Sequence, residues 1–104
     1  MTLDDIIEKY ELFKYGFPPI RMAYILEKDN EKILWIDPDA YSKNGFFIII
    51  NEKREVIKEL SFKEFYDNLE ILLENGWENN KEYCFIKDIK KWLIDFSEKY
   101  NIII

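Results

Sequence analysis

The spacing of apolar residues changes twice along this 104-residue chain, and those changes limit the folds open to it. Up to residue 15 the spacing is that of a helix, from residue 20 to residue 60 it favours strands, and from residue 62 it is helical again. Consecutive strands flanked by helices indicate an α+β domain with an antiparallel sheet. We expect an N-terminal helix, a four-stranded antiparallel sheet of two hairpins and two C-terminal helices, with the helices packed on one face. Without a linker or repeat, residues 1–104 are predicted to be a single globular domain.

A helix over 3–15 and a hairpin after it are predicted first. Thr2 can cap the helix, and Pro18-Pro19 cannot continue it. Asp29-Asn30 is typical of a two-residue turn between two strands. This turn predicts three directly opposed pairs: Glu27 with Lys32, Leu26 with Ile33, and Tyr24 with Trp35.

The next two strands are predicted to differ in burial. The segment from Phe46 to Ile50 is apolar on both faces, as expected for a strand that is covered on both sides. The segment 55–60 mixes charged and apolar residues, which indicates an edge strand, because charge on an edge discourages another strand from pairing there. Its alternation places Val56 and Leu60 on the same side of the sheet.

A well-marked helix follows the sheet. Ser61 and Glu64 have the spacing of a capping box, an apolar stripe at helical spacing comes after them, and Asn75-Gly76 ends the stripe. The predicted range is therefore 62–75. The polar segment 78–82 is expected to be a loop.

The last helix is predicted from its stripe between Ile89 and Tyr100, but its start is left open. The segment 83–86 is either its first turn or a short strand before an Asp88 cap. The apolar tail 102–104 either pairs with a sheet edge or folds back onto the core.

Several kinds of chemistry are missing from the chain, which has no histidine, one cysteine and three glycines. There is no imidazole to act as a general base or metal ligand, and one cysteine cannot form a thiolate zinc site. The glycines do not form a phosphate-binding loop. A calcium loop starting at Asp37 would place Tyr41 and Ile48 where oxygen ligands are needed. We therefore expect no enzymatic activity, no cofactor and no metal.

The compartment is predicted from the same residues. Cys84 stands alone and cannot form an intrachain disulfide, which favours a reducing environment. The acidic segment at 1–5 is unlike a signal peptide, and no apolar run approaches the roughly 20 residues of a transmembrane helix. We expect a cytoplasmic protein.

Negative charge is concentrated in one part of the chain. The net charge of −6 argues against direct binding of nucleic acid or of an anionic membrane. Residues 61–82 hold six acids and two lysines, and so contribute −4 of the total. On the helix predicted there, Asp67, Glu70 and Glu74 form one stripe, and Lys63 alone is placed to relieve it. In the last helix, by contrast, lysines and acids are interleaved.

This stripe and the aromatic residues outside the predicted core are the candidate binding surface, because Tyr and Trp are frequent in interface hot spots. The predicted partner-binding residues are Glu64, Asp67, Glu70, Glu74, Trp77, Glu78 and Tyr41. Such a protein suits a bacterial immunity protein or antitoxin that neutralises a basic, nuclease-type toxin. The alternatives are a phage or mobile-element inhibitor that imitates DNA, and an adaptor or scaffold subunit. The chain is expected to be a monomer or a homodimer.

Overall fold

The structure is a computed structural model that describes residues 1–13, 21–39, 43–80 and 86–104. These residues form three helices and a five-stranded antiparallel sheet, so the predicted α+β class is confirmed. In chain order the elements are α1 (Leu3–Lys9), β1 (Met22–Lys28), β2 (Glu31–Ile36), β3 (Phe46–Ile50), β4 (Val56–Ser61), α2 (Phe62–Glu74), β5 (Glu78–Asn79) and α3 (Ile89–Lys99). Tyr41, Tyr83 and Cys84 lie outside the described residues.

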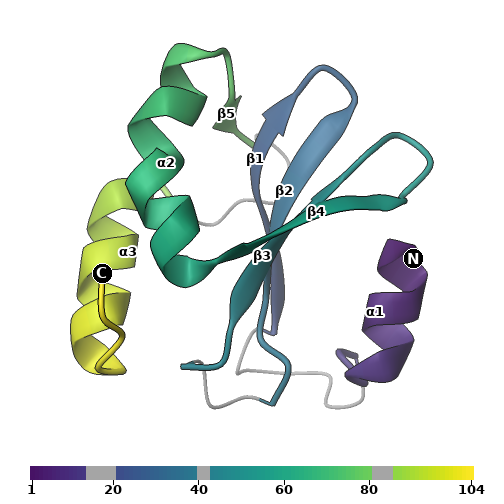
Figure 1. Cartoon of the computed structure of the whole chain (residues 1–104), viewed down its shortest axis with the longest axis horizontal. Helices are drawn as coiled ribbons and strands as arrows, with labels where there is room; N and C mark the ends of the chain where they lie inside the picture. Colours follow the sequence, from purple (N-terminus) through teal and green to yellow (C-terminus); the bar gives the residue numbers. More distant parts are fainter. Residues whose placement is uncertain (14–20, 40–42, 81–85) are drawn as a thin grey trace.

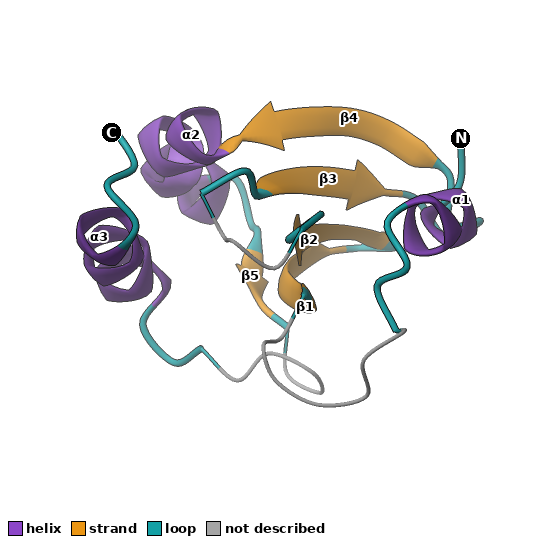
Figure 2. Cartoon of the chain, turned by 90° about the horizontal axis from the view of Figure 1, so that it is seen from below, coloured by secondary structure: helices purple, strands orange, loops and turns teal. Residues whose placement is uncertain are grey.

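The sheet lies between helices on both sides (Figures 1 and 2). α2 and α3 pack on one face, as predicted, whereas α1 packs on the opposite face, so the prediction that all helices share a face is wrong. The reason is that the inner strands are apolar on both sides. On β3, for example, Phe47 is buried toward α2 and α3, and its neighbour Ile48 is buried toward α1.

The strands lie in the order β4-β3-β2-β1-β5, so the first four form a meander in sequence order. β5 occupies the segment predicted to be a polar loop, and that prediction is wrong. It pairs with β1 with Glu78 opposite Glu27, and the Asn80 N–H donates to the Ile25 carbonyl at 3.0 Å. Backbone hydrogen bonds hold this two-residue strand, and the side-chain pattern therefore does not reveal it.

The first hairpin has the predicted turn but only part of the predicted register. Two of the opposed pairs are confirmed: Glu27 with Lys32 and Leu26 with Ile33. The third is wrong, because Tyr24 lies opposite Leu34 rather than Trp35. The cause is a β-bulge at Ile25, which lets Ile25 and Leu26 both pack in the core on the α2–α3 side.

β4 is an edge strand, as predicted, and it also contains a bulge. Ile57 is the extra residue, so Val56 packs in the core on the α1 side while Leu60 packs on the α2–α3 side. The prediction that Val56 and Leu60 share a side is therefore wrong. The extra residue itself is left 51 % exposed.

The first helix is shorter than the predicted range of 3–15. α1 begins at a capping box formed by Thr2, as expected, but it ends at Lys9, and Glu11 adopts a φ of 51° that a helix cannot continue through. The buried guanidinium of Arg21 then holds this end of the chain. It donates to backbone carbonyl groups in two separate segments, those of Tyr10, Glu11, Asp37 and Pro38.

The C-terminal elements are close to the prediction. α2 begins and ends within one residue of its predicted bounds. Asp88 caps α3 by accepting from the Lys91 N–H at 3.1 Å, so of the two alternatives left open the cap is present and Ile86 lies outside the helix. Residues 83–85 are outside the described part of the chain, so the short strand stays a prediction. The Ile102 N–H donates to the Ser97 carbonyl at 2.8 Å and its side chain packs against the core, so the tail folds back at this residue.

Candidate functional site

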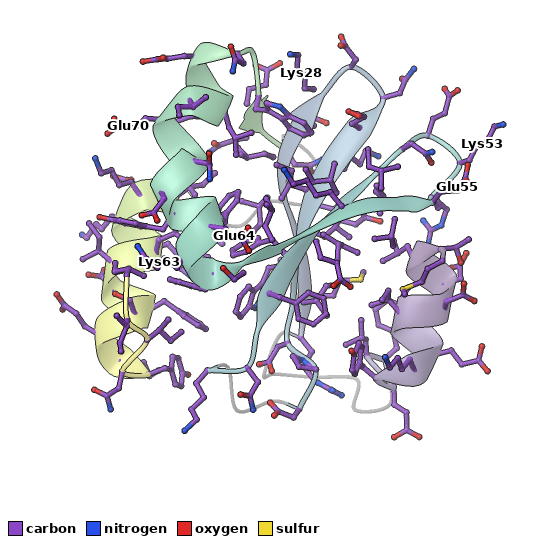
Figure 3. The ribbon with its side chains drawn as sticks, in the orientation of Figure 1. Lys28, Lys53, Glu55, Lys63, Glu64 and Glu70 are labelled. Atoms are coloured by element: carbon purple, nitrogen blue, oxygen red, sulfur yellow. The ribbon has the colours of Figure 1, made fainter. Side chains whose placement is uncertain are left out.

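α2 exposes its acidic residues because its apolar stripe faces the sheet. Phe62, Phe65 and Leu69 are buried in the core, whereas Lys63, Glu64 and Glu70 are exposed and point to solvent (Figure 3). In the capping box, the Ser61 N–H donates to the Glu64 carboxylate at 3.0 Å, and the Glu64 N–H donates to the Ser61 hydroxyl at 3.1 Å. The hydrogen bond from the Ser61 N–H to the carboxylate is the largest cause of the lowered pKa of Glu64. Glu64 therefore acts as part of the helix cap as well as lying on the acidic stripe.

Two other predicted carboxylates are paired with lysines. Asp67 accepts from Lys63 Nζ at 2.8 Å, within the helix, and Glu70 accepts from Lys90 Nζ of α3 at 2.8 Å. The second contact lowers the pKa of Glu70 and raises that of Lys90. The expectation that Lys63 alone relieves the stripe is therefore wrong, because α3 packs beside α2 and supplies a lysine. All four side chains are largely exposed, so neither pair contributes much to stability.

An exposed isoleucine that is not among the predicted partner-binding residues lies within the acidic stripe. The Ile71 side chain is 54 % exposed. It comes four residues after Asp67 and three before Glu74, so both carboxylates are its neighbours on the helix surface. The signal is present in the sequence, because the spacing that defines the stripe also places this apolar residue inside it.

The turn after α2 positions Trp77 and Glu78. Gly76 has a φ of 96°, the left-handed conformation that commonly ends a helix, and the Trp77 N–H donates back to the Leu72 carbonyl at 3.0 Å. Trp77 is half-buried, with part of its side chain packed against the core. Glu78 is exposed and lies opposite Glu27, which places two like charges side by side at the edge of the sheet.

The structure thus brings together a surface that we call the α2 acidic surface, composed of Glu64, Asp67, Glu70, Ile71 and Glu74. No basic residue occurs in the last turn of α2. Lys28, the last residue of β1, supplies a positive charge there, because its side chain passes close to Gly76. Trp77 and Glu78 lie just beyond this end, and Tyr41 is outside the described residues.

A shallow hollow of about 220 Å³ adjoins this surface between α2 and α3. Its lining consists of Tyr66, Asp67, Leu69, Glu70 and Lys90. Within the part of the chain that the structure describes, no group of three His, Cys, Asp or Glu residues is arranged to hold a metal ion. None of the described helices is long and apolar enough to cross a membrane.

The chain was compared with protein families, curated proteins and solved structures. No family model matches this chain, and no curated protein or solved structure is found to be similar to it. The geometry and charge of the α2 acidic surface are therefore the basis for the functional argument.

Proposed function

We propose that this protein is a non-catalytic binding module whose α2 acidic surface takes a basic protein partner. The position of Ile71 is the observation that carries the proposal. In a typical interface, a few central residues that are shielded from water in the complex carry most of the binding energy, and the contacts around them contribute less. Ile71 is an exposed apolar side chain with Asp67 and Glu74 as its helical neighbours, so a partner that covers it would bury an apolar centre surrounded by charge.

The surrounding charges suit fast association with a positively charged surface. Carboxylates on one helix face attract a basic partner from a distance and raise the association rate above the unsteered value of roughly 10⁵–10⁶ M⁻¹s⁻¹. The pairs of Asp67 with Lys63 and of Glu70 with Lys90 are exposed and weak. Both carboxylates can therefore exchange their lysine for a cation of the partner at little cost.

A nuclease-type toxin is the partner class that this chemistry supports best. Its nucleic-acid-binding groove must be basic, and an acidic protein that covers the groove would block its activity. In this role the protein would be a bacterial immunity protein or antitoxin, acting in the cytoplasm. An inhibitor that imitates DNA would use the same residues, so the identity of the partner separates the two.

Self-association at the sheet edge receives less support. In a two-fold antiparallel pairing of β4 with a second copy, a register centred on the middle of the strand places Lys58 opposite Lys58 or Glu59 opposite Glu59. Like charges in directly opposed positions destabilise a strand pair. A homodimeric scaffold joined at β4 is therefore disfavoured.

The test compares two double variants with the same change in charge. Asp67→Lys with Glu74→Lys alters the α2 acidic surface, and Glu52→Lys with Glu98→Lys alters exposed acids elsewhere. The partner captured from a native cell extract by the unaltered protein is purified, and its binding rates to each variant are measured. We expect the first variant to associate at least about tenfold more slowly, and the second to be close to the unaltered protein.

Two further readouts decide the partner class. Ile71→Asp is expected to weaken the complex about tenfold through faster dissociation. The unaltered protein is expected to inhibit the nuclease activity of the partner at equal concentration. Equal binding by the two double variants would rule out the α2 acidic surface. A partner that binds DNA without cleaving it would replace the toxin interpretation with that of a DNA mimic.

A further inference from the structure

A second surface feature lies on α3, away from the α2 acidic surface. It is a hollow of about 280 Å³ lined by Trp92, Asp95, Phe96, Lys99 and Tyr100. The three aromatic residues recur every four positions, so they form a ridge along one side of the helix. Their ring centroids are 5.0 Å apart between Trp92 and Phe96, and 4.6 Å apart between Phe96 and Tyr100.

The aromatic ridge packs against rings of the core on one side and is partly exposed to solvent on the other. Trp92 meets Trp35 edge-to-face at 5.7 Å, and Phe96 stacks on Phe62 at 5.7 Å, so both rings are fixed by the core. All three rings of the ridge are only partly buried. The hollow is therefore a preformed aromatic surface, and a ligand does not have to order these side chains on binding.

The charges around the hollow indicate which ligand it suits. Asp95 is exposed at its rim, and the chain's own Lys99 already places its ammonium 5.3 Å from the ring centroid of Tyr100. A cation at that distance is attracted by the negative face of the ring, and tryptophan attracts cations more strongly than tyrosine does. The hollow thus combines aromatic rings, a carboxylate and an intramolecular cation.

We propose that this hollow binds the side chain of an exposed arginine on a protein partner, which displaces Lys99. A guanidinium group is favoured over an ammonium group because it is less strongly hydrated and stacks flat on aromatic rings. Its planar set of donors can also form two hydrogen bonds to the Asp95 carboxylate while it lies against the ridge. This site does not depend on the α2 acidic surface, and it can be tested without the partner proposed above.

The first experiment uses two matched peptides that differ in charge alone. Acetylated and amidated Gly-Arg-Gly is titrated into the ¹⁵N-labelled protein, and Gly-citrulline-Gly serves as the neutral, nearly isosteric control. We expect the arginine peptide to shift the indole N–H of Trp92 and the backbone amides of 95–100, and to bind at least about fivefold more tightly than the citrulline peptide. Equal binding of the two peptides would overturn the proposal.

Substitutions of Lys99 and Asp95 test the displacement. Lys99→Gln removes the competing cation and is expected to tighten binding of the arginine peptide about threefold. Lys91→Gln removes the same charge from an exposed position of α3 outside the hollow, and is expected to have little effect. Asp95→Asn should weaken binding, whereas Glu98→Gln, which removes a carboxylate outside the hollow, should not.

Two outcomes separate this proposal from a general attraction of cations to an acidic protein. If Lys99→Gln and Lys91→Gln have the same effect, or if the shifts map to α2 rather than α3, the hollow is not the binding site. Binding of the arginine peptide should be unchanged in the Asp67→Lys, Glu74→Lys variant, because those residues do not line the hollow. Loss of binding in that variant would overturn the α3 site while leaving the α2 acidic surface in place.

Discussion

The two faces of the sheet are stabilised in different ways. On the α2–α3 face, aromatic rings pack on one another, with Phe47 stacked on Phe65 at 4.0 Å and Trp35 in contact with rings from both helices. On the α1 face the core is mainly aliphatic, and the seven-residue α1 ends at backbone groups held by a buried arginine. The comparison teaches that long helices are fixed here by side-chain packing, whereas the short helix also depends on polar contacts. Both proposed binding surfaces lie on the side with the rigid aromatic core.

Neighbouring substitutions on β3 compare the two faces directly and have the largest expected effect. Phe47→Ala removes a fully buried ring and is expected to lower the free energy of unfolding by about 4 kcal/mol. Ile48→Ala, on the opposite face, is expected to cost about 3 kcal/mol because it removes fewer atoms. Urea unfolding followed by circular dichroism measures both. A larger loss for Ile48→Ala would show that the α1 face is the dominant core.

Removing the buried guanidinium of Arg21 tests how much the polar contacts at the end of α1 stabilise the protein. Arg21→Met is expected to cost about 3 kcal/mol, because four backbone carbonyls lose their donor. Arg21→Lys keeps the charge but not the planar set of donors, and so should recover only a minor part of this loss. Urea unfolding gives both values. A cost below about 1 kcal/mol for Arg21→Met would show that the carbonyls find other partners.

The two capping boxes form a matched pair on opposite sides of the sheet. Ser61→Ala and Thr2→Ala are each expected to lower the free energy of unfolding by about 1 kcal/mol, since each removes the side-chain oxygen that accepts from the helix N-terminus. Ser61→Gly is the control, because glycine at this position costs only about a few tenths of a kcal/mol. Thermal unfolding of the three variants checks the order.

Acid dependence gives the smallest expected effect and concerns the α2–α3 face. In the folded protein the pKa values of Glu64 and Glu70 lie below the ordinary value of 4.5. Their contribution to the free energy of unfolding is therefore present above pH 4.5, and it is lost as the pH falls through the pKa values of the folded protein. Glu64→Gln should flatten the fall in stability below about pH 5, because glutamine keeps the capping hydrogen bond at all pH values.

Glu74→Gln is the control for this acid dependence. It removes an exposed carboxylate that forms no hydrogen bond within the described residues, so the fall in stability should match that of the unaltered protein. Stability is measured by urea unfolding at several pH values. If stability falls equally at low pH in the unaltered protein, Glu64→Gln and Glu74→Gln, the capping hydrogen bond adds no pH-dependent stability.

Features set by residues close in the sequence were predictable. The capping box at Ser61 and the Asp29-Asn30 turn each depend on a few neighbouring side chains, and both are confirmed. The Asp88 cap, one of two alternatives for the start of the last helix, is present. The bulges at Ile25 and Ile57 were not predictable. Each inserts one extra apolar residue into a strand, and the strand sequence alone is still compatible with regular alternation of side chains between the two faces. Strand register is a property of two chain segments, and one segment alone does not show where an extra residue is accommodated.

The candidate site shows the same division. The stripe of carboxylates on α2 follows from helical spacing, and so does the capping role of Glu64. The pair between Glu70 and Lys90 depends on how α3 packs beside α2, which local spacing does not determine. Ile71 lies between these cases: its place in the stripe follows from spacing, but a 54 % exposed side chain is recognised only once the packing of the helix is known.

The arginine below α1 has a consequence for how the protein opens. One guanidinium bridges the end of α1 and the segment after β2, so either segment that detaches alone loses its hydrogen bonds to Arg21. Hydrogen exchange should therefore report them as one cooperative unit, with the Tyr10 and Asp37 amides, which donate to the Ile6 and Arg21 carbonyls, sharing a single opening free energy. In this opening the N-terminal helix would separate from the sheet, while the aromatic core between the sheet and the other two helices stays packed.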